Sequence, residues 1–210
     1  MAPPSEPRFF TEDWSITLPS HPTIEFIRLT PPRSPEMIKI MSNPLNKPFE
    51  NPSERDEVWD ADFIADVNQR FLARYQKSKT DFQCLDIIVV IDGETVGSGA
   101  VQASPQVEEG LANIGLYLAE SARGKGIGKA TMEVLLRLSN EIDATHVHAG
   151  TMKANIPMRK LAKSLGFMER EEVLTVPGWG VVAEILFEDV RQERWKDLEM
   201  KVKFLGPAPE

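Results

Sequence analysis

Hydrophobic positions recur at helical spacing in two long stretches of this chain. From Ile127, apolar or small residues return after three, four, seven and eight positions, which is the pattern of one buried helical face. The residues of this face are Ala130, Thr131, Val134, Leu135, Leu138 and Ile142. A second helix, apolar at every fourth residue, is predicted to begin at Ser53 or Glu54. Its apolar positions are Trp59, Phe63, Val67, Phe71 and Tyr75.

Strand patterns fill most of the remaining chain. The β-branched run Ile87–Ile91 is followed by Asp92-Gly93, a strong hairpin signal, and then by the returning run Val96–Val101. A further turn leads to the run Leu111–Leu118, so three antiparallel strands are expected in sequence. The other predicted strands are Thr23–Leu29, Thr145–Thr151, Phe167–Val176 and Val181–Phe187.

Two shorter helices complete this plan. Ser34 followed by Pro35 is a helix start, and the helix is predicted to run to about Met41. Asn155 is a good N-cap for another helix, which Gly166 ends. The predicted order is β-α-α-β-β-β-α-β-α-β-β-α. It indicates a mixed α/β fold with a mostly antiparallel central sheet flanked by helices.

The two ends of the chain are expected to lie outside this plan. Residues 1–20 carry four prolines and little periodicity, which predicts an arm draped over the surface. Residues 190–210 are expected to form a C-terminal helical extension. Within it, Val190–Leu205 is predicted to be a charged helix anchored by Trp195 and Leu198, and to serve as a packing or homodimer surface.

The composition is that of an ordinary globular protein. With 210 residues, 41% hydrophobic and 27% charged, residues 1–210 are most simply one domain. The net charge of −8 argues against non-specific nucleic-acid binding and favours a neutral or cationic partner. No apolar run approaches the ~20 residues that span a bilayer, and the N-terminus has no secretory h-region. We therefore expect a cytoplasmic or nucleocytoplasmic location and no membrane partner.

Metal and disulfide chemistry are not expected. The three histidines and the single cysteine fit no zinc-ligand spacing, so no metal site is predicted. Cys84 belongs to the apolar run Cys84–Ile91, and it is expected to be a buried strand thiol rather than a nucleophile. One cysteine cannot cross-link the fold, which favours a reducing compartment.

The loop before the first long helix has the features of an anion site. Glycines occupy positions 124, 126 and 128, so the backbone can approach a ligand without interference from Cβ atoms. The first amides of a helix lack intrahelical partners and lie at the positive end of the helix dipole. Together with Arg123, Lys125 and Lys129, they would suit a pyrophosphate. The alternative is that Gly-Lys-Gly is only a flexible, solvated turn.

The spacing of this loop separates it from two other phosphate loops. A Walker-type loop needs a glycine at Arg123 and a Ser or Thr at Ala130, and the dinucleotide fingerprint needs a glycine at Lys129. The spacing that does fit is Arg-x-x-Gly-x-Gly, followed about thirty residues later by a helix that opens at Asn155 and closes with Leu-Gly-Phe at residues 165–167. Both motifs resemble those of the GNAT superfamily of acetyl-CoA-dependent N-acetyltransferases. The resemblance covers roughly residues 23–188.

The opening of the N-terminal half narrows the resemblance. The run Arg28-Leu29-Thr30-Pro31-Pro32-Arg33 before a short helix is similar to the RimJ/RimL-like branch of the superfamily.

The resemblance implies a site for acetyl-CoA as co-substrate. Leu116 and Leu118 would pair their backbone with the pantetheine arm, and the Leu118 amide would donate to the oxyanion. Asn155 would contact the amide arm of the coenzyme, although it also reads as a helix cap, and it could do both. The implied pyrophosphate contacts are Arg123, Gly124, Lys125, Gly126, Ile127, Gly128 and Lys129.

The chain departs from the family pattern where a general acid is expected. Ala162 replaces a Tyr that many members have, and Met158 replaces a Ser of the RimL-like branch. Either the protein is a non-catalytic acetyl-CoA binder, or the acid is dispensable because a thiol of pKa near 8.5 already leaves readily. With no evident acid and base, we expect an α-amine or another amine of lowered pKa. Base candidates, which also read as solvated or sheet-face residues, are Glu108, Glu109, His146 and His148.

The leading interpretation is an N-acetyltransferase that acts on a primary amine of a small molecule or peptide, by direct attack in a ternary complex. A catalytically silent acetyl-CoA-binding sensor or scaffold is the first alternative, and a phosphate-binding protein unrelated to coenzyme A is another. Substrate walls in such a fold would include Trp59, Phe63 and Trp179, of which the first two also fit core packing.

Overall fold

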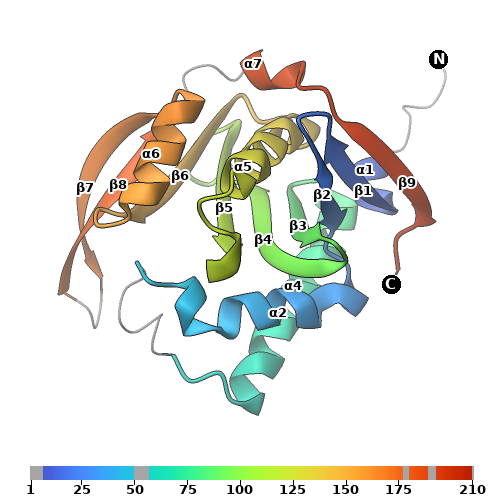
Figure 1. Cartoon of the computed structure of the whole chain (residues 1–210), viewed down its shortest axis with the longest axis horizontal. Coiled ribbons are helices and arrows are strands. Elements are labelled where there is room, and N and C mark those ends of the chain that lie inside the picture. Colours follow the sequence, from blue (N-terminus) through green and yellow to red (C-terminus); the bar gives the residue numbers. More distant parts are fainter. Residues whose placement is uncertain (1–6, 50–56, 177–179, 189–192, 210) are drawn as a thin grey trace.

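A computed structural model describes residues 7–49, 57–176, 180–188 and 193–209 of the chain. In this part of the chain, nine strands form one sheet, which is mostly antiparallel and carries helices on its faces (Figure 1). The expected fold class is therefore confirmed. In order across the sheet, the strands are β7 (Met168–Val176), β8 (Gly180–Glu188), β6 (His146–Met152), β5 (Leu111–Leu118), β4 (Glu94–Ala103), β3 (Cys84–Ile91), β2 (His21–Arg28), β1 (Glu12–Leu18) and β9 (Lys201–Pro207).

The helices lie on both faces of this sheet. The α-helices are α1 (Arg8–Thr11), α2 (Ser34–Ser42), α4 (Ala61–Asp81), α5 (Ile127–Leu138), α6 (Ile156–Leu165) and α7 (Glu193–Lys196). Short 3-10 turns are η1 (Pro31–Arg33), η2 (Pro44–Asn46), η3 (Glu120–Ala122) and η4 (Ser139–Ile142). In Figure 1, α5 crosses the middle of the sheet, while α2 and α4 lie together at its lower side.

One strand pair is parallel, and its register is short. β5 and β6 pair through Leu111–His146, Ala112–Val147 and Asn113–His148, and the register ends there. β6 then continues to Met152 along β8 on its other side, while β5 continues to Leu118 along β4. The two strands therefore diverge, and the last residues of β5 have no β6 partner. We call this gap the split.

The apolar pattern of the strands gives the two faces their cores. Leu118 and Leu135 belong to the large cluster under α5, and Phe71 and Ile88 belong to a smaller cluster under α2 and α4. β3 is buried along nearly its whole length because it is covered on both faces, which is why its sequence is apolar at every position except Asp86.

The prediction of a surface arm for residues 1–20 is wrong in its described part. Residues 8–11 form α1, and β1 pairs with both β2 and β9. In β1, Trp14, Ile16 and Leu18 are buried and alternate with half-buried polar residues, a strand pattern that the nearby prolines obscured.

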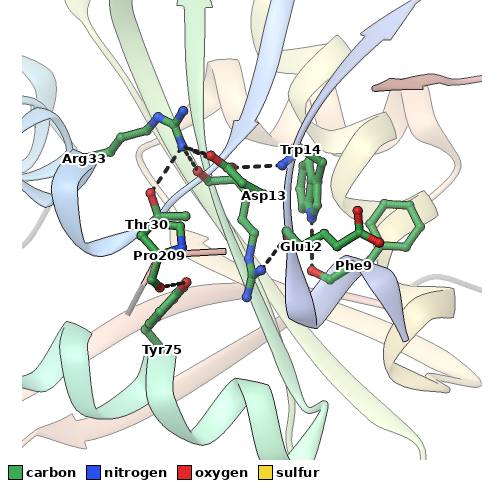
Figure 2. Close-up of polar contacts among 9 residues, drawn as sticks. Phe9, Glu12, Asp13, Trp14, Thr30, Arg33, Tyr75 and Pro209 are labelled. Atoms are coloured by element: carbon green, nitrogen blue, oxygen red, sulfur yellow. Dashed lines mark hydrogen bonds and ion pairs between the residues drawn. The ribbon is translucent and has the colours of Figure 1, made fainter. Parts of the chain in front are cut away.

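Buried polar bonds fix this N-terminal region. Arg28 is 2% exposed, and its guanidinium donates to the carbonyl oxygens of Phe10 and Glu12 at 2.7 and 2.6 Å. The indole Nε1 of Trp14 donates to Phe9 O at 3.0 Å, and Arg33 pairs with Asp13 at 2.9 Å (Figure 2). Since each bond joins segments of different elements, the N-terminal strand is an integral part of the sheet.

The predicted terminal helix Val190–Leu205 is also wrong for the described residues. Only residues 193–196 are helical, and β9 follows as an edge strand against β1. Val202 and Phe204 face the core in alternation with exposed lysines, a period of two that the charge of this segment concealed. Trp195 is confirmed as an anchor, at 3% exposure.

The long helix α4 begins later than predicted. Asp60 is its N-cap, and the Asp60 carboxylate accepts from Phe63 N at 2.9 Å. Ser53 and Glu54, the predicted start, lie outside the described residues. Trp59 therefore precedes the helix instead of lying on its first turn.

Candidate active site

The glycine loop enters α5 in a conformation that requires glycine. Gly124 and Gly126 have φ angles of 72° and 81°, and Gly126 is the N-cap of α5 with no side chain bonded to its first amides. The first helical hydrogen bond runs from Ala130 N to Gly126 O at 3.1 Å. The amides of residues 127–129 therefore precede the hydrogen-bond ladder of the helix, and Lys125 and Lys129 are exposed beside them.

Gly128 serves close packing instead. A Cβ atom at this position would lie 3.3 Å from Leu118 Cδ1 and 3.5 Å from Leu161 Cδ2. The start of α5 therefore packs tightly against the end of β5 and against α6. This packing holds the loop next to the split.

Two side chains attach this loop to its surroundings. Arg123 Nη2 donates to Leu118 O at 3.1 Å, which leaves the other guanidinium nitrogens available for a ligand. Asn46 is buried, and its Oδ1 accepts from Glu120 N at 2.9 Å, while its Nδ2 donates to Ile40 O at 2.9 Å. The sequence pattern gives no signal for Asn46, because it lies between two predicted helices and its partner is 74 positions away.

The backbone at the end of β5 faces the split. Ala119 N donates to Val96 O of β4 at 2.8 Å. Successive amides of a strand point to opposite sides, so the Leu118 N–H points away from β4, toward the side from which β6 has diverged. The same alternation turns the backbone groups of Leu116 in this direction. These are the two residues predicted to contact the pantetheine arm.

Asn155 acts as a helix cap. Its Oδ1 accepts from Met158 N at 3.2 Å, and its Nδ2 donates to Thr151 Oγ1 of β6 at 2.9 Å. The bonds join the start of α6 to the strand that borders the split. This is the capping role weighed from the sequence; contact with the coenzyme remains a prediction.

The structure does not bring the predicted base Glu109 near the split. Glu109 is exposed and precedes β5, whereas Leu118 ends this strand, so the seven steps from Leu111 to Leu118 separate them by roughly 23 Å along the strand. Glu108 lies in the same region, with its Oε1 3.4 Å from His146 Nε2.

His148 lies beside β5, between the levels of Leu111 and Leu118. It pairs in register with Asn113, at the last residue pair before the strands diverge. Burial, and then the neighbouring His146, lower the pKa of His148, while Glu188 and Glu172 act in the opposite direction. This lowered pKa favours the neutral imidazole.

A cavity of about 530 Å³ lies at the end of β5 on the face opposite α5. Leu118 is buried under α5, so Tyr117, one residue earlier, points to the other face and into this cavity wall. Trp59 and Phe63 are half-buried there with ring centroids 5.0 Å apart, so they line the cavity. Trp179 lies outside the described residues. The lining is Met37, Met41, Lys47, Glu57, Trp59, Phe63, Val67, Arg70, Phe71, Arg74 and Tyr117.

Other reactive groups in the described residues do not form a second centre. Cys84 is buried in β3, and burial raises the pKa of its thiol to about 12, which makes it a poor nucleophile. Among the described residues, no three potential metal-ligating side chains come together. Of the helices in this part of the chain, none combines the length and the apolar character needed to cross a membrane.

Residues 46–167 match the model of the acetyltransferase (GNAT) family. This match spans more than half of the chain, and it contains the glycine loop, the split and Asn155. No curated protein matches the sequence.

Solved structures of acetyltransferases share the fold at low sequence identity. The ribosomal-protein-S5-alanine acetyltransferase of Vibrio fischeri is 16% identical, with a TM-score of 0.65 over 84% of this chain and 96% of that chain. RimJ of Mycobacterium smegmatis, in complex with CoA-disulfide, is 16% identical, with a TM-score of 0.61 over 87% and 88%. The putative acetyltransferase yncA of Salmonella typhimurium, with acetyl-CoA, is 14% identical, with a TM-score of 0.63 over 80% and 93%.

Proposed function

We propose that this chain, which belongs to the acetyltransferase (GNAT) family, transfers the acetyl group of acetyl-CoA to a primary amine of a peptide or small molecule. The observation that carries the proposal is the position of the glycine loop. It enters α5 next to the end of β5, where the sheet opens between β5 and β6. An anion site and an unpaired strand edge therefore meet at one end of the sheet.

The coenzyme would lie across these two features. Its pyrophosphate would accept hydrogen bonds from the amides of residues 124–129, with Arg123, Lys125 and Lys129 supplying positive charge. Its pantetheine arm would extend along the free edge of Leu116 and Leu118. Structures of two similar proteins contain acetyl-CoA or a CoA disulfide, which supports this choice of ligand.

The reaction follows from this arrangement. The amine nitrogen attacks the carbonyl carbon of the thioester, a C–N bond forms, and the C–S bond breaks to release the coenzyme A thiolate. The attacking nitrogen loses one proton, which passes to solvent or to the thiolate. The Leu118 N–H, which points into the split, would donate to the carbonyl oxygen as negative charge develops there.

The residues present favour an amine that needs no dedicated base. Ala162 is fully buried and Met158 cannot transfer a proton, so neither of these two positions of α6 supplies an acid to the thiolate. Deprotonating a lysine-like amine of pKa ~10.4 costs roughly 4.5 kcal/mol at pH 7, against about 1–1.5 kcal/mol for an α-amine. We therefore propose an α-amine acceptor, and neither Glu109 nor His148 is required. The similar fold of ribosomal-protein acetyltransferases agrees with an acceptor of this class.

Release of free coenzyme A tests the proposal. The purified chain is mixed with acetyl-CoA and a library of α-amines, lysine derivatives and polyamines, and thiol release is followed along with the masses of the products. We expect release that depends on an α-amine and a product heavier by one acetyl group. Binding of acetyl-CoA without thiol release would indicate a silent module, and acetylation of lysine side chains far above α-amines would contradict the acceptor class.

A further inference from the structure

We infer that the acceptor is an aminoacyl compound with a bulky apolar first side chain, which occupies the cavity beside Tyr117. This inference rests on the proposed function and narrows it. It predicts peptides that begin with residues such as Leu or Phe, and it excludes small first residues as the preferred class.

The cavity is on the correct side of the split for an acceptor. The coenzyme phosphates would approach from the α5 face, because the glycine loop enters that helix. Tyr117 and Leu118 are consecutive, so the cavity begins within one residue of the N–H assigned to the oxyanion but on the opposite face. An amine that enters from the cavity therefore reaches the thioester from the side that the coenzyme leaves open.

The cavity wall is built to bury an apolar group. Its volume of about 530 Å³ lies within the range of roughly 300–1,000 Å³ that is typical of ligand pockets. Aromatic rings and thioethers adapt to apolar ligands of varied shape. The apolar residues of the wall are Met37, Met41, Trp59, Phe63, Val67, Phe71 and Tyr117.

The cations in this wall are already engaged within the protein. Arg70 pairs with Asp66 at 2.9 Å, and Arg74 pairs with the buried Asp86. Lys47 is buried with its Nζ 5.3 Å from the centroid of the Trp59 ring. These contacts engage the three cations, and the remaining charged residue of the wall, Glu57, is exposed to solvent, so the apolar surface determines which side chain fits.

Trp59 favours an acceptor that carries a carbonyl group next to its amine. Its Nε1 is buried and has no hydrogen-bond partner in the described residues, although the indole lines the cavity. Unpaired buried donors are rare in folded proteins because each one costs free energy. A small rotation of the indole toward the cavity would pair its N–H with the carbonyl oxygen of an aminoacyl group.

A panel of matched acceptors tests this inference on the wild-type chain. Peptides of the form Xaa-Gly-Ser-Gly, with Ala, Leu or Phe as Xaa, carry the same type of α-amine, so a difference in rate reports the side chain. At saturating acetyl-CoA, we expect kcat/KM for Leu and Phe to exceed that for Ala by about 10- to 100-fold, the effect of burying such a side chain. Equal rates, or a preference for Ala, would overturn the inference while the proposed function stands. Absence of acetylation of any amine would overturn both.

Two substitutions locate the effect. Val67→Phe fills the cavity, and we expect it to lower the Phe-to-Ala rate ratio about 10-fold or more; Ala73→Ser, on the exposed side of the same helix, should leave the ratio unchanged. Trp59→Phe keeps a ring and removes the N–H, so peptide rates should fall about two- to ten-fold. The rate for 2-phenylethylamine, which has no carbonyl and is assayed at about pH 9 so that enough of its amine is unprotonated, should not change. An unchanged ratio in Val67→Phe, or an equal loss for both acceptors in Trp59→Phe, would contradict the placement. The shift in melting temperature caused by acetyl-CoA verifies that each variant is folded.

Discussion

The two faces of the sheet at the end of β5 are built in different ways. On the α5 face, the proposed pyrophosphate site consists of the consecutive residues 123–129, and most of its proposed contacts are backbone amides. On the opposite face, the cavity is assembled from α2, the segment before α4, α4 itself and β5, and its contacts are side chains. The first site is therefore fixed by local backbone conformation and the second by long-range packing. Substitutions should therefore separate coenzyme affinity from acceptor selectivity.

The largest effect is expected from Arg123→Gln. This change removes a charge proposed to bind the pyrophosphate and the bond to Leu118 O, and hydrogen bonds to charged groups contribute about 1.5–3 kcal/mol. We expect the Kd for acetyl-CoA to rise roughly 10- to 150-fold, as measured by calorimetry. Arg137→Gln, which removes the same charge at the other end of α5, is the control and should bind normally. Normal affinity in Arg123→Gln would argue against the coenzyme site.

A slightly smaller effect is expected from Gly126→Ala. A Cβ at a φ of 81° costs about 1–2 kcal/mol, and the loop would relax away from the geometry that presents its amides. The Kd for acetyl-CoA should rise about 5- to 30-fold. Gly206→Ala places the same kind of strain in β9, at a φ of 105°, and should lower the melting temperature without changing coenzyme affinity. If Gly126→Ala and Gly206→Ala bound acetyl-CoA with the same affinity, the glycine loop would not be the coenzyme site.

On the acceptor face, Phe63→Ala should weaken use of the acceptor and leave coenzyme binding unchanged. It removes an aromatic wall and its edge contact with Trp59, which should lower kcat/KM for a Phe-initiated peptide about 10-fold. The KM for acetyl-CoA should stay the same, because Phe63 lies on the face away from the glycine loop. Steady-state kinetics with each substrate varied in turn measures both. Parallel changes in the two constants would mean that the faces are not independent.

The smallest effect is expected where the C-terminus supports α4. Tyr75 OH donates to Pro209 O at 2.7 Å (Figure 2), so Tyr75→Phe should lower the free energy of unfolding by about 1 kcal/mol. A denaturant titration measures this change. If Tyr75→Phe unfolded at the same denaturant concentration as the wild type, the bond to Pro209 would not hold the C-terminus.

The same contrast explains what the sequence could predict. The loop at residues 123–129, the cap at Asn155 and the run Leu111–Leu118 are local patterns, and the structure places them together at one end of the sheet. The partnership of Asn46 with Glu120 depends on tertiary packing across 74 positions, and no local signal encodes it. No sequence pattern marked Tyr117 as a cavity residue either. The alternation of side chains along β5 assigns Tyr117 to a face only once the elements that cover each face are known.

The predictions for the two ends of the chain were wrong for a related reason. Four prolines among residues 1–20 and the charges after residue 190 outweighed short alternating patterns such as Trp14–Leu18. β9 lies at the edge of the sheet beside β1, so this pairing joins two segments that are nearly the whole length of the chain apart. Propensity within one segment cannot reveal such a pairing, which depends on both strands being present.

We propose that the coenzyme enters from the α5 face and presents its thioester in the split. A crystal structure of the chain with acetyl-CoA tests it most directly. We expect pyrophosphate oxygens within hydrogen-bond distance of the amides of residues 125–129, and the thioester oxygen facing the Leu118 N–H. Coenzyme bound at another place on the sheet, or loop amides bonded to protein groups in the complex, would contradict it.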